Sequence, residues 1–200
     1  MTAKLTLDDF KRAAADLGVA VAAIRAVASV ETRGSGFLAD GVRPVILFER
    51  HVMRKQLIAN TGSRSPSIIQ YANPNIVNAS TGGYQGGAAE WDRLAEAIKL
   101  DRQSALESCS WGAFQIMGYW WKSLGYASVQ AFVNAMYSGE PGQLDAFVRF
   151  VKANPNLLHA LRAQDFAAFA KGYNGPDYAK NKYDTKMADA FTTYSKEHAA

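Results

Sequence analysis

The alternation of apolar and polar positions along this chain is mainly helical. Thr6, followed three residues later by Asp9, has the form of a capping box and predicts a helix over residues 7–17. Gly18 is well placed to end that helix. Residues 19–31 predict a second helix, which is apolar on most faces and therefore buried.

Two short apolar runs around an Asp-Gly pair predict a small β-hairpin. The runs are residues 37–39 and 45–48, and Asp40-Gly41 lies between them. Asp-Gly is a frequent two-residue turn between antiparallel strands. We expect the chain to return to helix over residues 49–57.

Residues 60–88 differ from the rest of the chain, because Asn, Ser, Thr, Gly and Tyr predominate there. The segment closes with the sequence Gly-Gly-Tyr-Gln-Gly-Gly at residues 82–87. A polar stretch of this length inside a compact domain is either disordered or a functional surface. Its tyrosines and amides favour a substrate-binding surface.

Helical signals return after residue 88 and continue to the C-terminus. Four groups of apolar residues share helix faces: Trp91, Leu94, Ile98 and Ala105; Leu144, Phe147, Val148 and Val151; Phe166 and Phe169; Met187, Ala190, Phe191 and Tyr194. Such stripes indicate core-facing surfaces, and Gly172 is expected to end the helix of the third group. The predicted fold class is α+β, predominantly α-helical, with a small hairpin near residues 37–48 and a single domain over residues 1–200.

The composition is that of a globular protein. Of 200 residues, 48% are hydrophobic and 20% are charged, which excludes a disordered, collagen-like or coiled-coil chain. Cys109 is the single cysteine, so an intrachain disulfide is excluded and a reducing compartment is indicated. The net charge of +4 favours association with anionic polymers, but no Lys/Arg run marks a nucleic-acid arm, and no nucleic-acid partner is expected.

Neither a signal peptide nor a membrane span is predicted. Asp8 and Asp9 lie where a signal peptide has its apolar segment. The longest apolar stretch, residues 19–30, contains Arg25 and is shorter than the roughly 20 apolar residues that a membrane helix needs. We therefore expect no stable insertion into a membrane.

The residue types that bind metals or act as nucleophiles are scattered. His51, His159, His198 and Cys109 show no metal-ligand spacing. The sequence contains neither a Gly-x-Ser-x-Gly elbow nor a Walker phosphate loop. A nucleophilic site formed by a cysteine and a histidine is a remaining alternative, but no sequence motif supports it. No metal and no cofactor are expected.

Glu31 is the carboxylate whose surroundings are unusual. It ends an apolar helix, where neighbouring valines desolvate it and the helix dipole is negative, and both effects raise the pKa of a carboxyl group. A neutral carboxylic acid can protonate the leaving oxygen of a glycosidic bond. The alternative is structural, with Glu31 paired to Arg33 or to another cation at the helix end.

Three segments resemble the goose-type lysozymes and lytic transglycosylases. Residues 30–34 are similar to their Glu-Ser-Arg-Gly helix end, residues 110–117 to their Gly-Leu-Met-Gln segment, and residues 173–175 to their late Tyr-Asn element. Residues 30–53 resemble, more closely, the N-acetylmuramidase family of phage endolysins. This resemblance extends over nearly the whole chain and implies a lysozyme-like fold.

The resemblance implies a peptidoglycan hydrolase, a muramidase that cleaves the β-1,4 bond between N-acetylmuramic acid and N-acetylglucosamine. In that family pattern Glu31 is the general acid and Gln115 is a cleft residue that binds the sugar acetamide or ring hydroxyls. Tyr173 and Asn174 would line the cleft near the acid. The alternative for the last three residues is packing beneath the start of a helix.

A second carboxylate is needed for hydrolysis by inversion or by retention. Glu49 is the candidate, 18 residues after Glu31 and at the far end of the predicted hairpin. Its alternative role is structural, in an ion pair with Arg50, Arg54 or Arg33.

Aromatic side chains are expected to supply platforms for sugar rings. Trp111 and Tyr84 are the candidates for substrate binding, and Trp120, Trp121 and Tyr71 could serve in the same way. Any single one of them is more often a core residue.

The resemblance also implies a partner and a place of action. Bacterial peptidoglycan is the expected substrate of a monomer that is made in the host cytoplasm and acts in the periplasm or cell wall after release. One alternative is a lytic transglycosylase, which yields a 1,6-anhydro sugar in place of a reducing end. Others are a chitin-cleaving enzyme and a non-catalytic wall-binding or structural phage protein.

Overall fold

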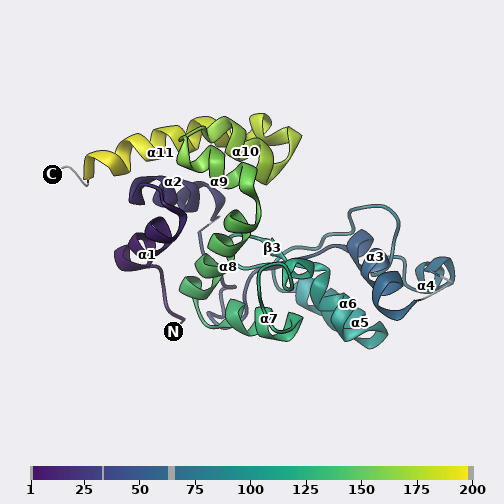
Figure 1. The fold of residues 1–200 in the computed structure, drawn as a ribbon. Coiled ribbons are helices and arrows are strands. Elements are labelled where there is room, and N and C mark those ends of the chain that lie inside the picture. Colours follow the sequence, from purple (N-terminus) through teal and green to yellow (C-terminus); the bar gives the residue numbers. More distant parts are fainter. Residues whose placement is uncertain (1, 33, 63–65, 198–200) are drawn as a thin grey trace.

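The computed structural model describes residues 2–32, 34–62 and 66–197, apart from the side chains of Pro66 and Asp177. Its elements are α1 (Leu7–Leu17), α2 (Val21–Glu31), β1 (Ile46–Phe48), α3 (Arg50–Thr61), α4 (Pro66–Ala72), α5 (Ala89–Leu100), α6 (Arg102–Glu107), β2 (Cys109–Trp111), β3 (Ile116–Met117), η1 (Gly118–Trp120), α7 (Val129–Tyr137), α8 (Glu140–Ala153), α9 (Pro155–Arg162), α10 (Phe166–Asn174), η2 (Pro176–Asn181) and α11 (Tyr183–Glu197). Figure 1 shows α1, α2 and α9–α11 on one side, α3–α6 on the other, and α8 with the small sheet between them.

The first two helices form as their sequences predict. The Thr6 hydroxyl accepts a hydrogen bond from the Asp9 amide (3.3 Å), and the Asp9 carboxylate accepts one from the Thr6 amide (2.8 Å). Gly18 ends α1 with a φ of +66°, a left-handed conformation that costs glycine little. Helix α2 begins two residues later than predicted and ends at Glu31, as predicted.

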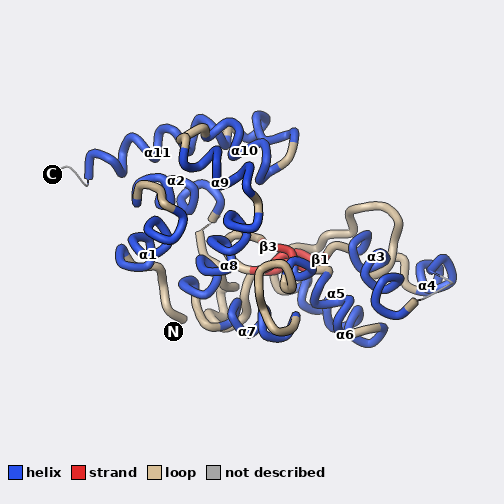
Figure 2. Tube along the Cα trace, in the orientation of Figure 1, coloured by secondary structure: helices blue, strands red, loops and turns tan. Residues whose placement is uncertain are grey.

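The strands come together from distant parts of the sequence. Strand β1 pairs antiparallel with β2, and β2 pairs antiparallel with β3. The predicted hairpin is present as a single bridge between Phe37 and Pro44. Strands β2 and β3, of three and two residues, were not predicted. Strands of two or three residues are too short to show an alternation of apolar and polar positions, so the sequence pattern does not predict them. Figure 2 shows how small the strand region is beside the helices.

The predicted helix end at Gly172 is wrong. Helix α10 continues through Gly172 to Asn174 and stops at Gly175, whose φ is +79°. A Cβ atom on Gly172 would lie 2.8 Å from Cδ2 of Leu157, so the glycine permits α9 and α10 to approach closely.

The polar segment is ordered over the part that the structure describes, residues 60–62 and 66–88. It contains α4 and then an irregular stretch. The Arg50 guanidinium donates to the carbonyls of Ser80 (3.0 Å) and Thr81 (2.6 Å). These bonds hold the stretch against the start of α3, and its role as a substrate-binding surface stays a prediction.

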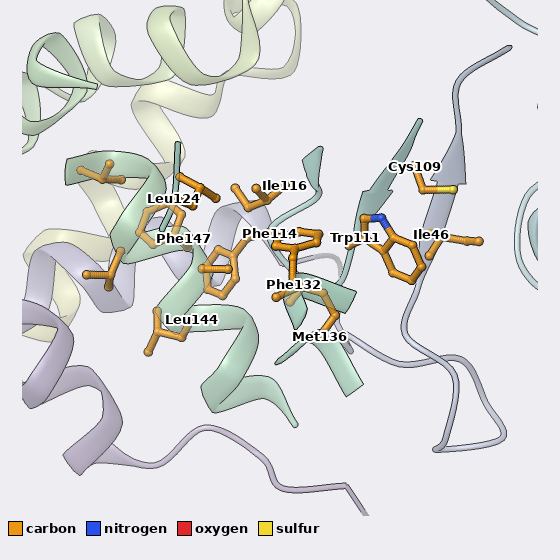
Figure 3. Packing of buried hydrophobic residues seen from close by; sticks show 14 of the residues in the cluster. Ile46, Cys109, Trp111, Phe114, Ile116, Leu124, Phe132, Met136, Leu144 and Phe147 are labelled. Carbon is orange, nitrogen blue, oxygen red and sulfur yellow. The ribbon is translucent and has the colours of Figure 1, made fainter. Parts of the chain in front are cut away.

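The buried apolar side chains form a core cluster that extends across both groups of helices. Its centre contains Trp111, Phe114, Phe132 and Phe147, drawn with their neighbours in Figure 3. Members of each predicted stripe are buried in it, among them Leu94, Leu144, Phe147, Val151, Phe166, Phe169 and Met187. The first three stripes therefore face the core, whereas in the last one Met187 is buried and Phe191 packs against the cluster.

A search of the described residues finds no single helix long and apolar enough to cross a membrane. Helices α1 and α2 are long and apolar enough only when their lengths are combined, and the two are bent by 112° at their junction.

The capping box should contribute measurably to stability. Thr6→Ala removes the acceptor for the Asp9 amide, so the free energy of unfolding should fall by about 1 kcal/mol. For a chain of this size the melting temperature should then fall by about 2–4 °C in differential scanning calorimetry. Thr193→Ala, which removes an exposed hydroxyl from within α11, is the control and should melt no lower than the wild type, because alanine favours the helix more than threonine does. Equal melting of both variants would contradict the prediction.

Candidate active site

A cleft of about 670 Å³ opens where the ends of α2 and α10 approach β1 and the turn between β2 and β3. The described residues that line it are Glu31, Ser35, Val45, Ile46, Leu47, Gly86, Gly87, Gly112, Ala113, Phe114, Gln115, Ile116, Met117, Tyr119, Trp120, Phe150, Tyr173, Asn174 and Tyr183. Four of the seven predicted site residues are among them: Glu31, Gln115, Tyr173 and Asn174. Folding therefore brings together three sequence segments that lie far apart along the chain.

Glu31 is the last residue of α2 and is half-buried at the cleft. Nδ2 of Asn174, at the end of α10, donates a hydrogen bond to Oε1 of Glu31 (2.8 Å). Val27 and Ala28 in the preceding turn are buried, as expected for an apolar helix. The carboxyl group lies at the C-terminal end of α2, where the helix dipole is negative. A raised pKa for Glu31 stays a prediction.

Tyr173 both lines the cleft and packs inward. Its hydroxyl donates to the carbonyl of Phe114 (2.6 Å), and its ring stacks on Phe169 with centroids 5.7 Å apart. Burial raises the pKa of Tyr173 well above its ordinary value of 10.0, and the charge of Glu31 adds to the effect. Tyr173 is therefore a neutral donor that ties α10 to the turn after β2.

Gln115 lies exposed at the cleft in a left-handed conformation, with a φ of +49°. Few residues other than glycine adopt this conformation, and such strain is concentrated at functional sites. Its side-chain oxygen accepts from the Ser110 hydroxyl (2.7 Å), and its Nε2 donates to the carbonyl of Gly112 (2.8 Å). These two bonds fix the orientation of the amide before any ligand arrives.

The buried amide of Gln143 fixes the turn that carries Gln115. Its Oε1 accepts from the Ala113 amide (2.7 Å), and its Nε2 donates to the carbonyl of Gly36 (3.2 Å). A Cβ atom on Gly112 would lie 2.5 Å from Cδ of Gln143, so glycine is required there. Sequence reasoning missed Gln143. The signal was a polar residue beside Leu144 in the apolar stripe of α8.

Glu90 was also missed, although it is completely buried. Its carboxylate accepts hydrogen bonds from the amides of Phe48 (3.0 Å), Gln85 (2.6 Å) and Gly86 (3.0 Å), and it pairs with Arg93 (2.7 Å). Burial acts to raise the pKa of Glu90, but these donors outweigh it and the net pKa is lowered. The carboxylate joins the end of β1 to the glycine-rich segment.

Glu49 does not line the cleft. The Tyr84 hydroxyl donates to its two carboxylate oxygens (2.8 and 3.1 Å), and Nδ1 of His51 lies 3.2 Å away. Of the three predicted ion-pair partners, Arg50 binds backbone carbonyls, Arg54 forms no ion pair with Glu49 in the described structure, and Arg33 lies outside the described residues. Burial and the Glu49 charge raise the pKa of Tyr84, so its hydroxyl stays a donor.

The aromatic platforms are distributed differently from the prediction. Trp111 is 1% exposed and donates through Nε1 to the carbonyl of Leu106 (3.1 Å), so its ring has no face open to a sugar. It is a core residue because β2 is the central strand of the sheet. Trp120, which lines the cleft beside Tyr119, is in position for a platform.

No group of three His, Cys, Asp or Glu residues that could hold a metal is found among the described residues. Burial raises the pKa of the Cys109 thiol well above 9.0, which disfavours the reactive thiolate. The candidate chemistry of the cleft consists of an acid at a helix end, fixed amides and the aromatic rings of Tyr119 and Trp120.

The fold is mainly helical with a short sheet, and it holds a carboxyl group in a cleft. The N-acetylmuramidase family matches residues 20–195 of the chain. Among solved structures, the chain is similar to the endolysin of Burkholderia phage AP3, with 52% identity and a TM-score of 0.91 over 96% of this chain and 72% of that one. The comparison with curated proteins gives no match.

The chain belongs to the N-acetylmuramidase family, and the predicted resemblance is confirmed. It is a glycoside hydrolase that acts on peptidoglycan.

Tyr173 should make stability depend on alkaline pH. Its pKa is higher in the folded than in the unfolded chain, so its contribution is complete below pH 10 and is lost as the pH rises toward the folded value. The free energy of unfolding, measured with urea, should therefore fall less between pH 9 and pH 11 for Tyr173→Phe than for the wild type. Tyr71→Phe, at a ring that is 91% exposed, is the control. Parallel pH profiles for wild type and Tyr173→Phe would refute this role.

Proposed function

We propose that the enzyme cleaves the β-1,4 bond between N-acetylmuramic acid and N-acetylglucosamine, with Glu31 as the general acid. One observation carries the proposal: among the described side chains that line the cleft, Glu31 alone has a carboxyl group. Its position at the end of α2 and its contact with Asn174 support the same role.

The contact with Asn174 orients the acid, because Oε1 of Glu31 accepts the amide hydrogen. Proton transfer from the neutral carboxyl group to the bridging oxygen lets the sugar leave and produces positive charge at the anomeric carbon. The Glu31 carboxylate that remains is well placed to stabilise that charge.

A water molecule then completes hydrolysis and leaves a reducing end. The prediction that Glu49 activates this water stays a prediction, but its contacts with Tyr84 and His51 support an anchoring role. A cleft in which Glu31 is the one carboxyl group among the described lining residues also suits a lytic transglycosylase, in which the 6-hydroxyl of the muramic acid attacks in place of water. That activity is the second candidate, and the product distinguishes the two.

We further propose that residues 1–200 act as one catalytic domain and as a monomer, without a nucleic-acid partner or membrane insertion. The core cluster, which extends through both groups of helices, supports a single unit. Similarity to a phage endolysin supports synthesis in the host cytoplasm and action on the wall after release.

Glu31→Gln should lower the rate of peptidoglycan digestion by at least about a hundredfold, because the amide cannot donate a proton to the bridging oxygen. Glutamine keeps an acceptor for Asn174, so the melting temperature should change little. Rates come from the clearing of purified sacculi, with the exposed Glu96→Gln as a fully active control. Wild-type activity in Glu31→Gln would exclude the proposed general acid.

Mass spectrometry of digested peptidoglycan should show muropeptides with reducing muramic acid ends. Products one water lighter, with 1,6-anhydro ends, would establish the transglycosylase instead. Glu49→Gln should give the same products at a rate within about tenfold of the wild type, as expected of a residue that does not touch the reacting atoms. A loss equal to that of Glu31→Gln would establish Glu49 as the second catalytic carboxylate.

A further inference from the structure

The Gly-Gly-Tyr-Gln-Gly-Gly segment contains two pairs of glycines with different surroundings. A Cβ atom on Gly82 or Gly83 would lie 3.6 or 3.3 Å from a guanidinium nitrogen of Arg50. A Cβ atom on Gly86 or Gly87 would meet nothing within 4 Å. The first pair therefore packs against protein, whereas the second pair faces open space.

The space in front of the second pair is the cleft. Gly86 and Gly87 are exposed and line the same cleft as Glu31, whereas Gly82 and Gly83 do not line it. Main chain that lacks side chains permits a ligand to approach the backbone closely. At Gly86 and Gly87 the cleft wall therefore consists of bare main chain.

This part of the wall is held in place. The buried Glu90 carboxylate accepts hydrogen bonds from the amides of Gln85 and Gly86 through Oε1 and from the amide of Phe48 through Oε2. A buried carboxylate is costly unless it is fully paired, and here its backbone donors come from the end of β1 and from the glycine-rich segment. The glycine pair is therefore fixed relative to β1, whose first two residues also line the cleft.

We propose that Gly86 and Gly87 form a subsite for one N-acetylhexosamine unit of the glycan strand, which packs against their bare main chain. The proposal rests on the proposed function, because it takes the cleft as the place where the glycan binds. A side chain at either position would occupy the volume of the sugar. These glycines therefore determine binding of the substrate, while Glu31 determines its chemistry.

Gly87→Asn tests the subsite without removing any contact in the protein. The φ of Gly87 is +55°, a left-handed conformation that asparagine tolerates, so the fold should persist while a side chain enters the cleft. Gly41→Asn is the matched control. Gly41 has a φ of +67°, no atom within 4 Å of a Cβ, and no place in the cleft lining.

The apparent KM for sacculi should rise about tenfold in Gly87→Asn while kcat stays within about twofold, as expected when binding is lost equally in the ground and transition states. Gly41→Asn should match the wild type in both constants. An unchanged KM in Gly87→Asn would overturn the subsite.

Sedimentation with sacculi gives a second measurement that needs no turnover. It compares Glu31→Gln with the Glu31→Gln/Gly87→Asn double variant at a temperature where circular dichroism shows both folded. Weaker binding by the double variant supports the subsite, and equal binding overturns it. Failure of the proposed function is distinguished by a different measurement. In that case Glu31→Gln would digest sacculi at the wild-type rate, independently of what Gly87→Asn does to binding.

Discussion

The hydrogen bond from Asn174 to Glu31 depends on keeping the ends of two helices together. Glu31 closes α2 and Asn174 closes α10, and α11 packs against both of these helices (Figure 1). Tyr173 adds a bond from α10 to the turn after β2. A displacement of either helix end would therefore move the acid away from its donor and change the shape of the cleft.

The walls of the cleft depend on buried polar side chains more than on apolar packing. A cleft interrupts the core, so main-chain groups beside it lose the partners that regular elements would provide. Gln143 supplies partners to the turn after β2, and Glu90 supplies them to the glycine-rich segment and the end of β1. Both side chains are almost completely buried and fully engaged, which is the condition under which such groups stabilise a unique arrangement.

The proposed function divides chemistry and binding between different parts of the cleft. Glu31 and Asn174 come from helix ends, and the dipole of α2 acts on the Glu31 carboxyl group. Gln115 and the two cleft-lining glycines come from turns, where left-handed backbone places amides and bare main chain at the surface. Such a division would permit the binding surface to change in evolution without disturbing the proposed proton donor.

The features that the sequence determined by itself depend on neighbouring residues or on the resemblance to a known family. The Thr6 capping box, the end of α2 at Glu31 and the core stripes depend on neighbours within a few turns of helix, and short segments placed Gln115, Tyr173 and Asn174 in one site. The tertiary structure alone decided the partner of β1, the burial of Trp111, the close approach at Gly172 and the anchoring roles of Gln143 and Glu90. Each of these depends on packing or hydrogen bonds with other parts of the fold, several of them distant in sequence, and periodicity in a single segment holds no information about such contacts.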